Sequence, residues 1–205
     1  MKKFAYFIMI LFCLVIFTSC QNNTIKNVPT EILMDDGTAV LAENSAIDFY
    51  FYYPENFIMQ RNDIMITLYV NDETVQQSNI QNPNSEENFP VMTKSNLQAT
   101  VFALQSGTYE TVGQYWEEFA LPSYKEIFQD IEIESEEDIT IGEDKDISAK
   151  KYTYTFSISG MKFKVSDIIF FRKQQVYNLK YTSTESKYSD YVNVLNTSAN
   201  TFKFK

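Results

Sequence analysis

Three apolar runs separated by two tight turns occupy residues 151–183, and they constrain the fold more than any other part of the chain. In the first run, residues 151–158, aromatic and aliphatic side chains alternate with Lys, Thr and Ser, which is the period of a β-strand. Ser159 and Gly160 predict a hairpin turn after this run, and Lys173 and Gln174 predict the next turn. The sequence therefore predicts three consecutive antiparallel strands.

The second of these strands loses its alternation at its end, where residues 168–171 are all apolar. A strand that is apolar on both sides is covered on both faces of its sheet. Three strands cannot supply that cover themselves, so helices from elsewhere in the chain are expected to pack on each side.

Two segments have the pattern of amphipathic helices. Thr111 and Gln114 have the spacing of a capping box, and an apolar stripe that includes Trp116 follows at helical intervals. Pro122 should kink this helix or split it in two, and Trp116 is expected in the core. A second stripe around Leu195 predicts a helix near the C-terminus.

The remaining segments read mainly as strands. Further strands are predicted at residues 46–53, 64–70 and 96–104, a hairpin at 31–42, two short acidic strands between 131 and 141, and a last strand at 202–204. Strands and helices come in blocks and do not alternate, which favours a mainly antiparallel sheet. The expected fold class is α+β, a three-layer α/β/α sandwich with a central, mainly antiparallel sheet.

The N-terminus has the organisation of a bacterial lipoprotein leader. Lys2 and Lys3 precede an uncharged apolar run at residues 4–17, which is shorter than the roughly 20 residues that span a bilayer. Residues 17–20, Phe-Thr-Ser-Cys, resemble a lipobox, which implies a signal peptide at 1–19 and acylation, palmitate included, of Cys20. The alternative is an ordinary signal peptide that leaves one free thiol. The expected location is the extracytoplasmic face of a bacterial cell membrane.

The rest of the chain divides into a tether and one domain. Residues 20–45 are expected to form a tether with a possible short hairpin, and residues 46–205 an α/β domain. Residues 71–95 are rich in Asn, Gln, Ser, Glu and Pro, and predict a long loop that is either a disordered insertion or a binding loop.

Composition excludes several kinds of function. The 205 residues include 17 basic and 27 acidic side chains, so an acidic body would be repelled by nucleic acid. Histidine is absent, which removes the commonest general base, the commonest metal ligand and any Ser/His or Cys/His nucleophile. The sequence therefore predicts a non-catalytic protein without cofactor or nucleic-acid partner.

Two groups of residues are candidate ligand sites. Tyr50 and Tyr52 share the outer face of the strand at 46–53 and would form a stacking platform for sugars or peptides, although strand propensity alone also enriches Tyr. Asp144 and Asp146 belong to an acidic cluster at residues 134–146 that would hold calcium through oxygen ligands. The cluster lacks the EF-hand order, and the alternative is a solvated acidic edge, with no metal site.

Several short runs resemble the PsbP-like family, named for an extrinsic subunit of photosystem II and also found as bacterial lipoproteins. The matching positions are Tyr53-Pro54 with Phe57, Asn96-Leu97 to Val101, the helix around Tyr115, Tyr152 to Tyr154, Gly160, residues 176–183 and Phe202. The resemblance covers about residues 46–205. It implies an α/β/α sandwich used for binding other proteins, and it carries over no site residue.

Three functions remain open. The first is an accessory lipoprotein that binds a protein partner in the cell envelope. The second is a receptor for a small ligand, such as a sugar or peptide, with residues 71–95 as a lid over the Tyr face. The third is a carboxylate-based hydrolase, which needs two acidic groups in a pocket. A deep pocket beside Tyr50 or Tyr52 would favour the receptor, and a flat surface there would favour the protein partner.

Overall fold

A computed structural model of the protein describes residues 25, 27–35, 37–70, 77–81, 88–92, 94–104, 108–128 and 130–205, with only the backbone for 77–81 and 88–92. The predicted leader at 1–19 and the predicted lipidation site Cys20 lie outside these residues. None of the helices in the described ranges is long and apolar enough to cross a membrane.

The described residues form a main sheet of seven strands in the order β4-β5-β8-β12-β11-β10-β9. All of its strand pairs are antiparallel. The strands are β4 (Phe57–Asn62), β5 (Met65–Val70), β8 (Asn96–Ala103), β9 (Glu132–Ile141), β10 (Ile147–Ile158), β11 (Met161–Arg172) and β12 (Gln175–Thr184). The three strands predicted at 151–183 are β10, β11 and β12, and both predicted turns are confirmed.

Both turns use a left-handed backbone. In the turn between β10 and β11, φ is 51° at Ser159 and 78° at Gly160, and in the next turn it is 49° at Lys173 and 61° at Gln174. Two consecutive residues with positive φ are the signature of a two-residue hairpin loop whose twist matches that of the flanking strands.

A second, smaller sheet of four strands in the described residues has the order β1-β2-β3-β13. These strands are β1 (Glu31–Met34), β2 (Gly37–Glu43), β3 (Phe49–Pro54) and β13 (Lys203–Phe204). The predicted N-terminal hairpin and C-terminal strand are thus confirmed. Because β2 pairs with β3, the hairpin belongs to the folded body, although the sequence assigned it to the tether.

The helical elements follow two of the strand blocks. After β8 come α2 (Val112–Tyr115), a π-helical segment η1 (Trp116–Ala120) and α3 (Leu121–Ile127). After β12 come a 3₁₀ turn η2 (Glu185–Lys187), α4 (Tyr188–Tyr191) and α5 (Asn193–Asn200). Pro122, which has no N–H to donate, lies in the first turn of α3, and the π-helical segment η1 precedes α3 without a break in the helix.

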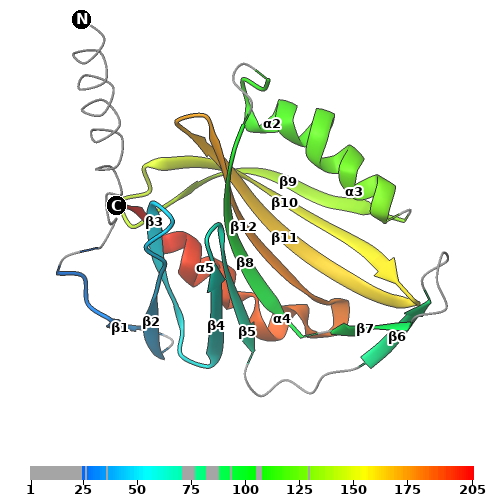
Figure 1. The fold of residues 1–205 in the computed structure, drawn as a ribbon, viewed down its shortest axis with the longest axis horizontal. Coiled ribbons are helices and arrows are strands. Elements are labelled where there is room, and N and C mark those ends of the chain that lie inside the picture. The colour runs from blue at the N-terminus through cyan, green and yellow to red at the C-terminus, as the bar shows by residue number, and fades with distance from the viewer. Residues whose placement is uncertain are drawn as a thin grey trace, which may run out of the picture.

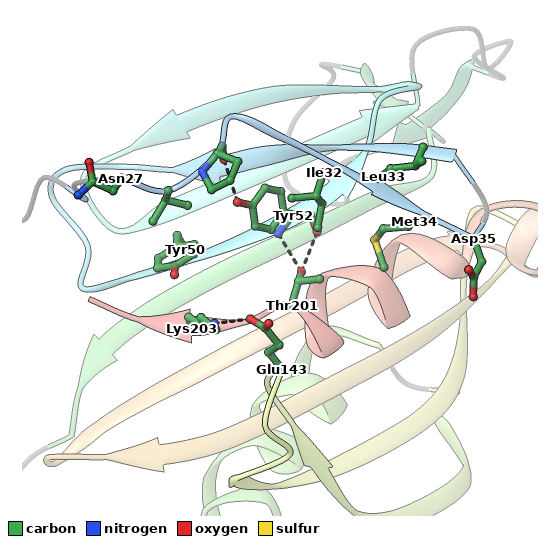
Figure 2. A pocket seen from close by; sticks show the side chains of 12 residues that line it. Asn27, Ile32, Leu33, Met34, Asp35, Tyr50, Tyr52, Glu143, Thr201 and Lys203 are labelled. Atoms are coloured by element: carbon green, nitrogen blue, oxygen red, sulfur yellow. Dashed lines mark hydrogen bonds and ion pairs between the residues drawn. The ribbon is translucent and has the colours of Figure 1, made fainter.

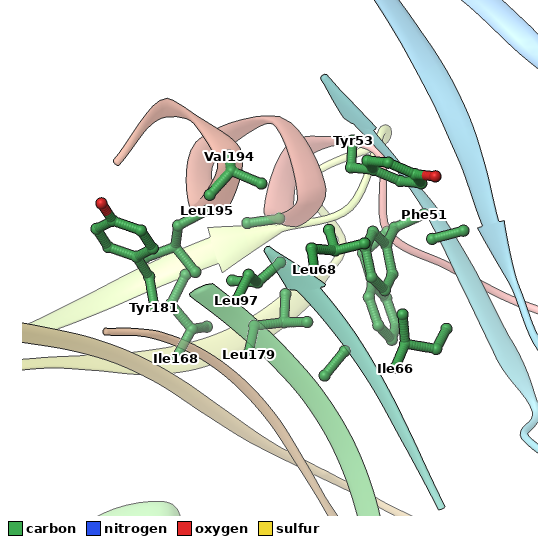
Figure 3. Packing of buried hydrophobic residues seen from close by; sticks show 14 of the residues in the cluster. Phe51, Tyr53, Ile66, Leu68, Leu97, Ile168, Leu179, Tyr181, Val194 and Leu195 are labelled. Atoms are coloured by element: carbon green, nitrogen blue, oxygen red, sulfur yellow. The ribbon is translucent and has the colours of Figure 1, made fainter. Parts of the chain in front are cut away.

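Helices cover opposite faces of the main sheet, as predicted (Figure 1). On one face Trp116 stacks on Tyr152 with ring centroids 3.9 Å apart, within a core that also holds Tyr154. On the other face, Val194 and Leu195 of α5 pack over apolar side chains of β8 and β12, and β3 completes this core (Figure 3). The three-layer α/β/α arrangement is therefore present, with the small sheet added to the α5 layer.

Two strand predictions were wrong in detail. The acidic segment forms one edge strand, β9, and not two short ones, because a bulge opposite Thr153 and Tyr154 lets it continue along β10. Strand β4 was not predicted from the sequence. It pairs antiparallel with β5, and the chain reverses direction between Asn62 and Met65.

The predicted loop at 71–95 is not free of regular structure. Its described parts include β6 (Gln77–Gln81) and β7 (Asn88–Met92), which pair antiparallel as a separate two-stranded sheet. The sequence gives this hairpin a weak strand pattern, because β6 has a single apolar residue, Ile80, and Pro90 interrupts the apolar run of β7.

Candidate functional site

A pocket of about 620 Å³ lies beside Tyr50 and Tyr52, between the N-terminal hairpin and the end of the chain (Figure 2). One wall is the segment that leads into β1, together with β1 itself. The opposite wall is formed by β3, by β13 and by the loop after β9. The lining residues are Asn27, Val28, Pro29, Ile32, Leu33, Met34, Asp35, Tyr50, Tyr52, Glu143, Thr201 and Lys203.

Tyr50 and Tyr52 do not form the open stacking platform that the sequence predicted. Their exposed fractions are only 9% and 7%, because the N-terminal segment folds over this face of β3. The Tyr52 hydroxyl donates a hydrogen bond of 2.8 Å to the carbonyl oxygen of Pro29. The expected flexible tether therefore ends before this point, and residues 27–35 become one wall of a ligand-sized cavity.

The apolar wall of the pocket comes mainly from β1 and the residues before it. Ile32 and Met34 pack beside Tyr50 and Tyr52, with Val28 next to them. Leu33 stands at the rim with 87% of its surface exposed. A ligand that covered this exposed leucine would remove apolar surface from water, which is favourable.

A charged pair lies on the facing wall. The Lys203 ammonium donates to the Glu143 carboxylate, and this hydrogen bond, together with the attraction of that charge, raises the pKa of Lys203. Burial is the main cause that raises the pKa of Tyr52, with further contributions from Tyr50 and Glu143. The pocket thus joins an apolar side to an ionic one.

Thr201 fixes the floor of the pocket to two elements. Its Oγ1 accepts a hydrogen bond of 2.9 Å from the backbone N–H of Tyr52 and donates one of 2.7 Å to the carbonyl of Thr197 in α5. The position of β3 is therefore tied to the helix that covers the main core.

The pocket is large enough for a small ligand, and its lining includes two acidic side chains, Asp35 and Glu143. Within the described residues, Asp167 is the only buried acidic side chain, and it lies in the main sheet, away from this pocket. A carboxylate-pair hydrolase needs two acidic groups that face one space, and Glu143 of this pocket is paired with Lys203. The lining suits an amphipathic molecule, with its apolar part against β1 and a polar end near Lys203 and Glu143.

The calcium candidates Asp144 and Asp146 lie in the loop between β9 and β10. No group of three or more Asp, Glu, Cys or His side chains that could hold a metal ion occurs within the described ranges. Acidic residues of β9 pair instead with lysines of neighbouring strands: Glu136 and Asp138 lie 2.6 and 3.1 Å from Lys150, and Glu134 lies 2.6 Å from Lys164. Hydrogen bonds to Glu136 and Asp138, together with the attraction of their charges, raise the pKa of Lys150.

The sequence did not identify most of this site. Lys203, Thr201 and the apolar residues 28–34 come from the two ends of the chain, and no local pattern indicates that they meet. The described parts of the segment 71–95, which was expected as a lid over the Tyr face, do not line the pocket, and β6 and β7 lie far from β1 in the fold (Figure 1).

Comparison with known proteins supports the fold and assigns no activity. No protein-family model matches the chain, and no curated protein matches it in sequence. Cyanobacterial PsbP from Synechocystis sp. PCC 6803 is similar in structure, with a TM-score of 0.51 and 11% identity over 89% of this chain and 98% of that one. LpqN of Mycobacterium tuberculosis, involved in cell envelope biogenesis, gives a TM-score of 0.45 and 13% identity over 86% and 90% of the two chains. The chain therefore has a PsbP-like fold, as the sequence resemblance implied.

Proposed function

We propose that this chain is a non-catalytic, lipid-anchored binding protein of the bacterial cell envelope, and that it takes up a small amphipathic ligand in the pocket beside Tyr50 and Tyr52. The observation that carries this proposal is the pocket itself, whose volume of about 620 Å³ lies in the range of small-molecule sites. A flat surface at these tyrosines would have favoured a protein partner.

The expected anchor places this pocket close to lipid. Seven peptide units separate Cys20 from Asn27, the first lining residue, and a fully extended chain of that length spans roughly 25 Å. Acylation of Cys20 would therefore hold the pocket near the membrane surface, where amphipathic molecules concentrate.

The anchor is tested by a Cys20→Ala substitution. Because two acyl chains give durable membrane attachment, we expect the wild-type protein in the membrane fraction and the variant outside it. Labelling with a palmitate analogue should mark only the wild type. An unchanged distribution of the variant would overturn the anchor and leave the pocket to be judged separately.

The pocket is tested by filling it. Saturation-transfer NMR on the full chain, with hexanoate, hexylamine and hexanediol as probes, should detect binding of at least one amphiphile. An Ile32→Trp substitution should abolish that signal, because the larger ring occupies the cavity. Ile58→Trp, at an exposed position on β4 outside the pocket, is the matched control and should bind as the wild type does. Failure of all three probes, or equal binding by both variants, would contradict the proposal.

A protein partner remains a second candidate function. Strand β1 is an edge of the small sheet, and such an edge can accept a further strand from another chain. A photo-crosslinking residue in place of Leu33 should then capture a specific envelope protein, whereas the same residue in place of Ile127, exposed on α3, should not. If shortening residues 71–95 abolishes the crosslink, that segment is part of the interface, and if the crosslink is unchanged, it is an insertion.

A further inference from the structure

A second hollow lies where the π-helical segment η1 and α3 meet β8 and β12. It consists of two adjoining cavities of about 260 and 160 Å³ that share Phe102, Tyr115 and Phe119 in their linings. We call the two together the aromatic cleft. It lies on the Trp116 side of the main sheet, whereas the Tyr50 pocket lies beyond the α5 side, so the two sites are independent.

One wall of the cleft presents aromatic rings to solvent. Phe102 and Phe119 are 38% and 48% exposed, although the phenylalanines of the core are almost fully buried. The ring of Phe119 lies 5.5 Å from that of Tyr115 and 6.3 Å from that of Tyr109, measured between centroids. These neighbours limit the movement of Phe119, so its exposed face is held in a fixed position.

The π-helical turn accounts for the position of Phe119. Segment η1 spans Trp116–Ala120, where Trp116 and Ala120 are buried while Phe119 is exposed. A π-helical turn is rare and is frequently found at a functional site. Here it brings Phe119 beside the cleft while Trp116 remains stacked on Tyr152.

The inner end of the cleft is polar, and none of the described residues that line it is acidic. Thr100, Asn178 and Lys180 come from β8 and β12, and Tyr124 comes from α3. The Lys180 ammonium donates a hydrogen bond of 3.3 Å to the Tyr124 hydroxyl and forms no ion pair within the described residues. Hydroxyl, amide and ammonium groups therefore face the space that the two phenylalanines border.

An acidic side chain lies behind this polar end. Asp167 is fully buried, and its carboxyl group accepts hydrogen bonds from the Asn178 amide and, at 3.3 Å, from the Tyr124 hydroxyl. The same Tyr124 hydroxyl accepts the hydrogen bond from the Lys180 ammonium, so it links the two groups. A ligand at this end of the cleft therefore meets a carboxyl group behind the lysine, which does not favour an anion.

Neutral polar groups continue outward from the cleft along the same sheet face. In the strand register Lys180 lies opposite Gln98, Gln98 opposite Thr67, and Thr67 opposite Gln60. These residues alternate with core residues such as Leu97 and Leu179, so they lie on the face that bears the cleft. Gln98 and Gln60 therefore present neutral amides on this face, whereas Thr67 between them is buried.

From this combination we infer that the aromatic cleft binds an uncharged saccharide. The less polar face of a sugar ring would lie against Phe102 and Phe119, where its burial is favourable. Its hydroxyl groups would exchange hydrogen bonds with Thr100, Asn178 and Lys180. A saccharide fits better than an aromatic carboxylate, because an anion would meet the field of Asp167 as well as that of Lys180.

The inference is tested with the full-length protein in a detergent that has no sugar headgroup. Glucose, galactose, N-acetylglucosamine, glucuronate and phenylacetate are titrated separately and followed by heteronuclear NMR. We expect at least one neutral sugar to bind with a Kd on the order of 1 mM, typical of a small open site, and to shift amide signals around Thr100 and Phe119. Binding of phenylacetate or glucuronate alone, or shifts confined to another surface, would overturn the inference.

Variants localise the site further. Phe102→Ala and Phe119→Ala should each weaken sugar binding at least tenfold, and Thr100→Val should weaken it by removing one hydrogen bond. Ile127→Ala removes an exposed apolar side chain from the same helical layer outside the cleft and should leave binding unchanged. Circular dichroism establishes that each variant is folded, and a folded Phe119→Ala that binds as the wild type does would also overturn the inference.

Discussion

The Tyr52 hydroxyl connects the N-terminal segment to β3 through its hydrogen bond to Pro29, and the ring is almost fully buried. Removing the hydroxyl in Tyr52→Phe leaves the Pro29 carbonyl without that donor. We expect the free energy of unfolding to fall by about 1 kcal/mol, the usual net value of such a bond. Urea unfolding measures the change. Tyr69→Phe, which removes a partly exposed hydroxyl on β5, is the control, and an equal loss in both variants would contradict this assignment.

Asp167 predicts a dependence of stability on pH. Burial raises its pKa, although the Lys180 charge and the hydrogen bonds from Asn178 and Tyr124 act in the opposite direction. A carboxyl group with a raised folded pKa contributes its full stability below the unfolded pKa, about 3.9, and loses it as the pH rises through the folded value. Ionisation of Asp167 is therefore expected to destabilise the fold at neutral pH.

The measurement compares Asp167→Asn with the wild type by urea unfolding at pH 4 and pH 7. The variant cannot ionise, so its stability relative to the wild type should be greater at pH 7 than at pH 4. Asp63→Asn, at an exposed turn position, controls for the change in net charge. A relative stability that stays constant or falls between these pH values would refute the role of Asp167.

Some residue positions could be predicted from the sequence and others could not. The alternation along β3 correctly placed Tyr50 and Tyr52 on one face, but it contained no sign that residues 27–34 would cover that face. Asp167 could have been found, because it lies in the row of β11 side chains that includes Val165 and Ile169, and a carboxyl within an apolar row predicts a buried charge. Lys203 and Glu143 are far apart in the sequence, and no local pattern predicts that they form a pair.

At the scale of elements, the start of the helix at residue 112 depends on one side chain. The Thr111 Oγ1 accepts a hydrogen bond of 3.1 Å from the backbone N–H of Gln114. Thr111→Ala should lower the free energy of unfolding by about 1 kcal/mol, the typical loss of an N-cap, while Thr111→Ser should retain most of it. Thermal unfolding followed by circular dichroism tests both. If serine does not restore what alanine loses, the cap is not the cause.

Elements with local signals were predicted well, and those that depend on distant partners were not. The hairpins of β10, β11 and β12 follow from turn residues and alternation within 33 residues of sequence, and the structure confirms them. The continuity of β9 depends on a bulge against β10, which no pattern within β9 marks. Likewise β4 is held as a sheet edge by β5, and its exposed, partly polar residues weaken the strand pattern.

At the scale of the whole molecule, the main sheet separates two apolar cores, and a helical layer covers each of them. Trp116 belongs to the cluster with Tyr152 and Tyr154, whereas Leu195 belongs to the cluster on the opposite face. Side chains in different clusters, without shared partners, should contribute independently to stability. The layered architecture therefore makes a quantitative prediction about pairs of substitutions.

The pair Trp116→Phe and Leu195→Val tests that independence with modest changes that keep the protein folded. Each substitution removes buried apolar volume and should cost about 1–2 kcal/mol of unfolding free energy. The double variant should lose the sum of the two within about 0.5 kcal/mol, measured by urea unfolding. As a positive control for coupling, Trp116→Phe is combined with Tyr152→Leu, which removes the ring that stacks on Trp116 at 3.9 Å, so the two changes should not be additive. A coupling between positions 116 and 195 as large as that between 116 and 152 would mean that the two faces do not form separate cores.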